Sequence, residues 1–179
     1  MRILATACLC LLLAACGVSQ TAPVDIASVR ALLTQEVAII ALGINREDPV
    51  LASQPVSDRF LMGANVAGRY RDQPFDGRGV AAFRVFFGGT DGVFGVNANI
   101  EQTMVLTDVE LQGDDLAAAV VFTNFSSVRV DKTPPEIVPP QIEPWRDLFV
   151  FQREGGAWRL INWDEAPLPP HDQGGGGTV

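Results

Sequence analysis

The residues with the clearest chemical potential lie near the C-terminus, at the open end of a predicted hairpin. Residues 145–164 are typical of two strands joined by a tight turn at Gly155-Gly156. This turn places Asp147 opposite Asp164, with Asn162 close by. Two opposed carboxylates have a raised pKa or share a cation, and beside an amide donor either is a candidate general base. The alternative is that both lie in water at the ends of the strands.

The same register divides the rest of the hairpin between two apolar faces. One face carries the candidate ligand-binding residues Phe149, Phe151, Leu160 and Asn162. The other carries Leu148, Val150, Ile161 and Trp163, which need cover from a partner or from the proline-rich segment 133–144. Periodicity alone does not choose which face points inward, so the assignment stays open.

A third candidate carboxylate is Asp58, in a segment for which the sequence predicts a short helix over 57–62. Residues in this region are able to line a cavity. The alternative role for Asp58 is that of a surface or capping residue.

Other kinds of chemistry are excluded by composition. The three cysteines, Cys8, Cys10 and Cys16, all lie near the N-terminus, and the one histidine, His171, lies in a Pro/Gly tail. A domain that starts after them lacks a thiolate nucleophile and a Ser-His-Asp triad. No metal-ligand spacing is present, and we expect neither a metal nor a cofactor. The formal net charge of −8 argues against a nucleic-acid partner.

A polar loop at 69–78 carries three arginines, Arg69, Arg71 and Arg78. Guanidinium groups gathered in this way could bind an anion. Asp72 and Asp76 are interleaved with them, so the alternative is a solvated loop with mixed charge.

The N-terminus has the form of a signal peptide. Arg2 is followed by an apolar run over 3–15, which is too short to span a bilayer. The run ends in Leu13-Ala14-Ala15-Cys16, which resembles the lipobox of bacterial lipoproteins. The resemblance implies cleavage before Cys16, lipidation of its thiol and acylation, for example with palmitate, which anchors the protein in the membrane. Gly17 follows where an inner-membrane retention signal would have Asp, which favours the periplasmic face of the outer membrane.

The body of the chain predicts an α+β domain. Apolar spacing of three and four residues indicates a helix over 25–42 with Asp25 as N-cap and Gly43 as C-cap, and another helix over 79–87. From residue 93 the pattern is that of strands, with a long hairpin over 104–112 and 116–130. We expect a signal peptide at 1–15, a lipidated tether at 16–23, one domain at 24–165 and a disordered tail at 166–179.

The order of these elements, with Gly156-Ala157-Trp158-Arg159-Leu160-Ile161 leading the last strand, resembles the NTF2-like (SnoaL-like) superfamily. The resemblance implies N-terminal helices packed in a curved antiparallel sheet, which together form a cone. Catalytic members place Asp, His or Tyr in the cone, whereas this body has no histidine and one tyrosine, Tyr70.

Two functions follow from this resemblance. The first is a non-catalytic envelope lipoprotein that binds a small apolar ligand or a protein partner. The second is an isomerase, dehydratase or hydrolase that uses Asp as general base. Superfamily members also dimerise through the outer face of the sheet, which implies a homodimer here.

The lipobox resemblance gives a direct test. Replacing the thiol by a hydroxyl removes the acceptor for the lipid, so Cys16→Ser is expected to yield an uncleaved precursor that incorporates no labelled palmitate. Metabolic labelling followed by electrophoresis measures both effects. Normal labelling of the variant would refute lipidation at Cys16, and Cys10→Ser is the matched control.

Overall fold

The computed structural model describes residues 25–167. The predicted signal peptide, the lipidation site Cys16, the tether and the tail from residue 168 onward therefore lie outside the described residues.

The first helix supplies one wall of the core. Helix α1 spans Ile26–Asn45, and the Asp25 side chain caps it by accepting hydrogen bonds from the backbone N–H of Ala27 and Ser28. By length and composition α1 could cross a membrane, yet its buried residues form a stripe that packs in the domain core: Val29, Leu33, Val37, Ile40 and Ile44.

The predicted C-cap at Gly43 is wrong. The helix continues for two further residues, and Gly43 instead contacts the following helix, where a Cβ atom would come within 2.2 Å of the Ala52 nitrogen. The glycine is therefore required by a close approach of two backbones.

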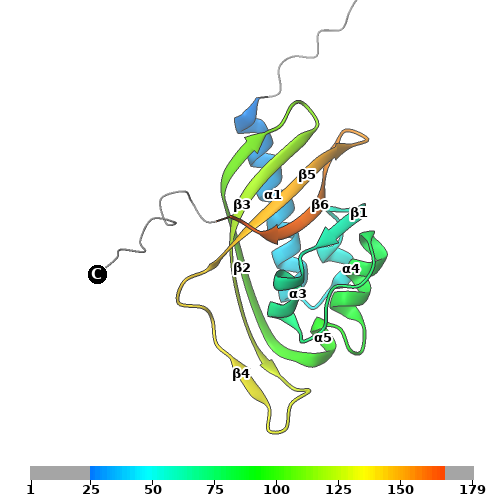
Figure 1. Ribbon diagram of the computed structural model, residues 1–179, viewed down its shortest axis with the longest axis vertical. Coiled ribbons are helices and arrows are strands. Elements are labelled where there is room, and N and C mark those ends of the chain that lie inside the picture. Colours follow the sequence, from blue (N-terminus) through cyan, green and yellow to red (C-terminus); the bar gives the residue numbers. More distant parts are fainter. Residues whose placement is uncertain (1–24, 168–179) are drawn as a thin grey trace, which may run out of the picture.

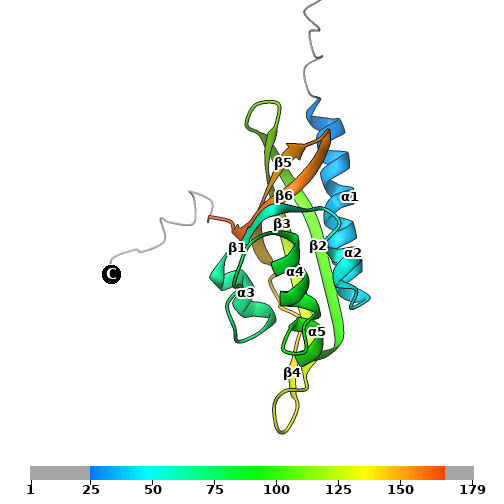
Figure 2. The ribbon, with the colours of Figure 1, turned by 90° about the vertical axis from the view of Figure 1, so that its right-hand side faces the viewer.

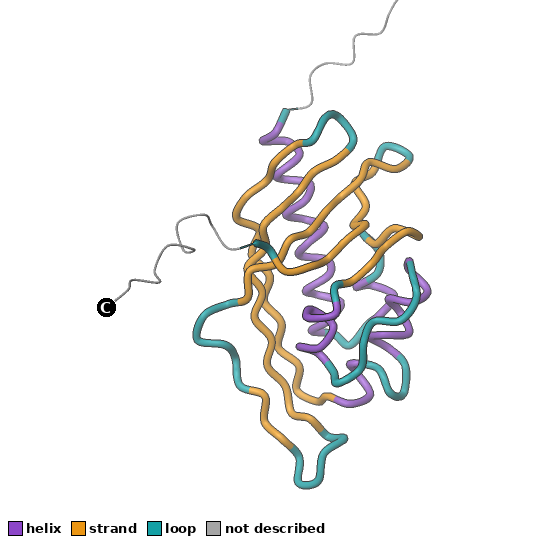
Figure 3. The backbone as a smooth tube through the Cα atoms, in the orientation of Figure 1, coloured by secondary structure: helices purple, strands orange, loops and turns teal. Residues whose placement is uncertain are grey.

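All the strands of the described residues belong to one curved sheet (Figures 1 and 3). Its hydrogen-bonded order is β1-β6-β5-β3-β2, with short β4 paired to β3. Only β1 and β6 are parallel, and the other pairs are antiparallel. The strands are β1 (Val56–Met62), β2 (Asn97–Leu111), β3 (Leu116–Arg129), β4 (Glu136–Val138), β5 (Trp145–Glu154) and β6 (Ala157–Glu165).

Helices cover one face of this sheet, with α1 running along β2 (Figures 1 and 2). The remaining helices are α2 (Pro49–Ala52), α3 (Ala64–Tyr70), α4 (Gly79–Gly88) and α5 (Val93–Val96). Buried residues of α1, α3 and α4 join those of the sheet in one core. The domain is thus an α+β fold in which helices pack within a curled half-barrel, as the sequence predicts.

Two segments differ from the sequence-based expectation. The predicted helix at 57–62 is strand β1, in which Val56, Phe60 and Met62 are buried while Asp58 and Arg59 are exposed. The segment 69–78 was expected to be a loop, but its first two residues, Arg69 and Tyr70, belong to α3.

The C-terminal hairpin forms as predicted near its turn and departs from prediction beyond it. Phe151 pairs with Leu160 as expected, but the next pair is Val150 with Asn162, which leaves Ile161 as a one-residue bulge. Since side chains alternate between faces, one extra residue exchanges the faces of everything that follows. Asn162 therefore pairs with half-buried Val150 rather than with Phe149.

The same bulge brings Trp163 inward. Trp163 pairs with Phe149 and is fully buried, with its ring centroid 4.8 Å from that of the phenylalanine. The prediction that Trp163 shares the outer face with Leu148 is wrong for this reason.

Candidate functional site

A buried carboxylate forms the centre of the polar interior. Asp147 on β5 is completely buried, and its Oδ1 accepts from Arg69 Nη1 at 2.5 Å. Its Oδ2 accepts from Thr123 Oγ1 and from Trp163 Nε1, both at 2.8 Å. One carboxylate thus connects α3, β3, β5 and β6: Arg69 neutralises its charge, and two uncharged donors bind its other oxygen.

Arg69 extends this network to the surface. Its Nη2 donates to Glu165 Oε1 at 2.6 Å, and its guanidinium lies 4.8 Å from the centroid of the Trp145 ring. Burial acts to lower the pKa of Arg69, but Asp147 and Glu165 together outweigh it and raise the pKa. Hydrogen bonds from Asn65 and Arg69 hold the pKa of Glu165 below its usual value.

Tyr70 lies beside this network and is almost fully buried. Its hydroxyl donates to Gln102 Oε1 at 3.1 Å, and the backbone of Gln102 exchanges two hydrogen bonds with the Asn45 side chain at the end of α1. Burial raises the pKa of the Tyr70 phenol, and the charge of Asp147 raises it further, against a smaller opposing effect of Arg69. The phenol is therefore neutral over the physiological pH range.

Aromatic side chains fill the interior around these polar groups. The ring of Tyr70 packs edge-on against three others, Phe87, Phe125 and Trp163, with centroids 4.8–5.7 Å apart. Three of the four predicted ligand-binding residues, Phe149, Phe151 and Leu160, are 0% exposed within this packing. They lie on the inward face, which is one of the two assignments that the sequence left open. They pack against other side chains of the core.

The three candidate carboxylates do not converge. Asp147 pairs with Glu165 across the strands, not with Asp164 as predicted, because the bulge shifts the register by one residue. Asp164 is exposed and packs against Gly63, where a Cβ atom would lie 2.1 Å from its Oδ1. Asp58 is exposed on β1 and lines a shallow polar pocket of about 280 Å³. Only Asp147 belongs to the interior.

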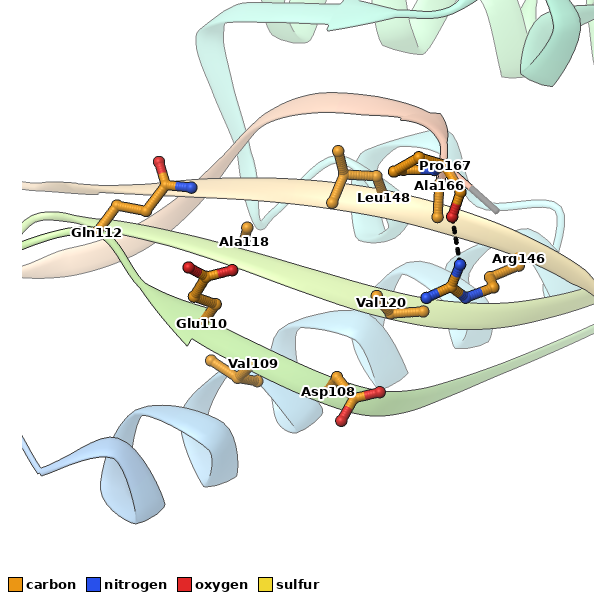
Figure 4. Close-up of a pocket in the computed structure, with 10 residues that line it drawn as sticks. All are labelled: Asp108, Val109, Glu110, Gln112, Ala118, Val120, Arg146, Leu148, Ala166 and Pro167. Atoms are coloured by element: carbon orange, nitrogen blue, oxygen red, sulfur yellow. Dashed lines mark hydrogen bonds between the residues drawn. The ribbon is translucent and has the colours of Figure 1, made fainter. Parts of the chain in front are cut away.

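The outer face of the sheet carries a groove of about 510 Å³ (Figure 4). Its floor is apolar, with Ala118, Val120 and Leu148 from β3 and β5, and Asp108 and Glu110 line it from β2. At its other end the Arg146 guanidinium donates a hydrogen bond to the carbonyl of Pro167. The groove therefore presents opposite charges on the two sides of an apolar floor.

The structure includes site residues that the sequence did not single out in these roles. Thr123, Gln102 and Trp163 bind the interior polar groups from three different strands. Arg69 was grouped with an anion-binding loop, and its partner Asp147 is 78 residues away in the chain. Both faces of β3 near Thr123 are apolar in sequence, so alternation alone indicates neither its burial nor what it contacts. Among residues 25–167 no cluster of three His, Cys, Asp or Glu side chains is placed to hold a metal ion.

Comparison with known proteins assigns the fold. No protein-family model matches the sequence, and no curated protein matches it. An NTF2-like superfamily protein from Salmonella enterica matches in structure with a TM-score of 0.55 and 18% identity, covering 86% of this chain and 100% of that one. The chain has the NTF2-like fold.

Two further neighbours have different roles by name. The hexachlorocyclohexane dehydrochlorinase LinA-type3 from Novosphingobium barchaimii matches with a TM-score of 0.60 and 9% identity, covering 80% of this chain and 92% of the enzyme. The association domain of CaMKII from C. elegans matches with a TM-score of 0.53 and 11% identity, covering 79% of this chain and 97% of that domain. At these identities the likeness concerns the fold and leaves the function open.

The buried ion pair predicts a strong effect of Asp147→Asn. The substitution leaves the guanidinium of Arg69 inside the protein without its main counter-charge, which is expected to cost roughly 3 kcal/mol of unfolding free energy. Asp164→Asn, at an exposed carboxylate of the same hairpin, is the matched control and should change stability by less than about 0.5 kcal/mol. Urea-induced unfolding measures both. Equal effects of the two variants would contradict the ion-pair assignment.

The phenol of Tyr70 predicts the pH dependence of stability. Tyr70 is the one tyrosine of the chain, so ultraviolet absorbance at alkaline pH reports this residue alone. Its pKa is higher in the folded state than in the unfolded state. The stabilisation from the neutral, buried phenol is therefore complete below the unfolded pKa of about 10 and is lost as the pH rises above it. We expect ionisation to coincide with unfolding seen by circular dichroism. Ionisation of the folded protein near pH 10 would contradict the burial of the phenol.

Proposed function

We propose that this chain is a lipid-anchored protein of the bacterial envelope whose NTF2-like domain acts as a non-catalytic module for protein interaction. The observation that supports this most directly is the filled interior, in which the rings of Tyr70, Phe149 and Trp163 are 0–2% exposed. A substrate needs a cavity of about 300 Å³ or more. The rings of Tyr70 and Phe149 lie 5.7 Å and 4.8 Å from the ring of Trp163, which leaves no such space among these three side chains.

The state of Asp147 supports the same proposal. A general base must lie within hydrogen-bond reach of the proton that it removes. Both oxygens of Asp147 already accept hydrogen bonds, and Oδ1 forms an ion pair with the guanidinium of Arg69. The hydrogen bonds of this carboxylate are made to other parts of the fold, which supports a structural role for Asp147.

The partner that best fits the outer face of the sheet is a second copy of the chain. Val105 and Phe122 are paired across β2 and β3, and they remain 59% and 37% exposed. The apolar floor of the groove continues this surface. A two-fold dimer brings the same patch of each copy together, so Arg146 of one copy can meet Asp108 of the other. This arrangement supports a homodimer formed through the sheet.

An enzyme of the dehydrochlorinase, dehydratase, isomerase or hydrolase kind is the second candidate. Two observations favour it, namely the similarity to a dehydrochlorinase fold and the presence of a carboxylate, Asp147, inside the cone. This alternative requires the aromatic interior to open. A turnover that Asp147→Asn abolishes and Asp164→Asn leaves intact would favour the enzyme.

The dimer is tested by two valine substitutions with similar exposure. Val105→Asp puts a charge on the proposed interface, while Val50→Asp puts the same charge on α2 at a position that is 54% exposed. We expect the mature chain in detergent to sediment as a dimer, and Val105→Asp to weaken association at least about tenfold because two carboxylates become buried against each other. Val50→Asp should leave association unchanged. A wild-type monomer, or equal effects of both variants, would refute this interface.

A further inference from the structure

Arg71 is an arginine that forms no ion pair with a carboxylate of the described residues. Its Nη1 donates to the backbone carbonyl of Asp91 at 2.6 Å, and its guanidinium lies 4.7 Å from the centroid of the Phe86 ring. Its Nε is buried and has no hydrogen-bond acceptor within residues 25–167. A buried donor without an acceptor is costly, so its presence calls for an explanation.

The carboxylates close to Arg71 are used elsewhere or point elsewhere. Asp72, the next residue, accepts hydrogen bonds from Arg129 and from Lys132. Burial lowers the pKa of Arg71, and the charge of Asp91 partly offsets this without forming an ion pair. By contrast Arg69, two residues earlier, has two carboxylate partners.

Arg71 also lines a pocket of about 360 Å³ on the outside of the domain, between the end of α3 and the turn that follows α4. Gln73, Thr90 and the acidic residue Asp91 also line this pocket, and Val85 supplies an apolar wall that is 69% exposed. The turn has little freedom, since a Cβ atom on Gly95 would lie 1.9 Å from the Thr90 carbonyl oxygen. The pocket wall is therefore held in place by backbone packing.

We propose that this pocket binds a small organic carboxylate, with the anionic group on Arg71 and a short apolar part against Val85. A carboxylate supplies a counter-charge to the half-buried guanidinium, which forms no ion pair with a described carboxylate. The amide of Gln73 and the hydroxyl of Thr90 are suited to donate to the same group. The pocket volume lies at the lower end of the range for small-molecule sites. This site is separate from the interior and from the groove, and its existence does not depend on the function proposed above.

Binding of propionate to the full mature chain in detergent tests the proposal. Equilibrium dialysis with labelled propionate, at constant ionic strength set with sodium chloride, should show one saturable site. Arg71→Gln should weaken binding at least about tenfold, since a charged hydrogen bond is lost. Arg78→Gln, which removes an exposed arginine of the same loop, should leave binding unchanged. Binding that is non-saturable, or equal in both variants, would overturn the proposal.

A second variant covers the case in which Arg71→Gln fails to fold. Val85→Glu places a carboxylate at an exposed position of the pocket wall, where it can pair with Arg71. We expect it to abolish propionate binding while the thermal unfolding temperature stays equal or rises. Retained binding in this variant would contradict the site. Binding of inorganic phosphate in place of propionate would contradict the proposed class of ligand.

Discussion

The fold depends on how one buried charge is compensated. Removing the Asp147 carboxylate from water costs several kcal/mol unless donors replace the water. Here the donors come from helix α3 and from strands β3 and β6, so these elements must all be in place before the charge is stabilised. The carboxylate therefore favours one arrangement of the sheet and α3 over alternatives with similar apolar burial.

The bulge at Ile161 makes that compensation possible. Without it, regular alternation would pair Asn162 with Phe149 and leave the indole of Trp163 on the outer face. With it, Trp163 enters the interior and its N–H reaches Asp147. Hydrophobic alternation cannot reveal such a bulge, since Ile161, Asn162 and Trp163 fit either register. The hairpin was thus predictable near its turn and not at the end where its chemistry lies.

Caps and apolar spacing within a segment predicted the long helix and the last hairpin. Strand β1 and the ion pairs depend on residues far apart in the chain. The Asp25 cap and the stripe of α1 are readable because a helix determines its own spacing, and the last hairpin carries the pattern that led to the NTF2-like fold. Strand β1 was missed because Val56 and Phe60 are four residues apart, which also suits a helix, and its strand character depends on pairing with β6 about a hundred residues later. The partners of Arg69 could not be predicted for the same reason, since Asp147 and Glu165 are 78 and 96 residues away in the chain.

Arg69 and Arg71 differ in how the fold compensates their charges. They are two residues apart, but α3 ends between them, so one guanidinium points into the cone and the other lies beneath the turn after α4. Arg69 finds two carboxylates, and its positive charge is then fully used within the fold. Among residues 25–167, Arg71 donates to a carbonyl oxygen and lies over an aromatic face, and the charge of Asp91 acts on it without an ion pair. Since Tyr70, Phe149 and Trp163 are buried against one another, the two binding sites that we propose lie on the surface, at the pocket beside Arg71 and on the outer face of the sheet.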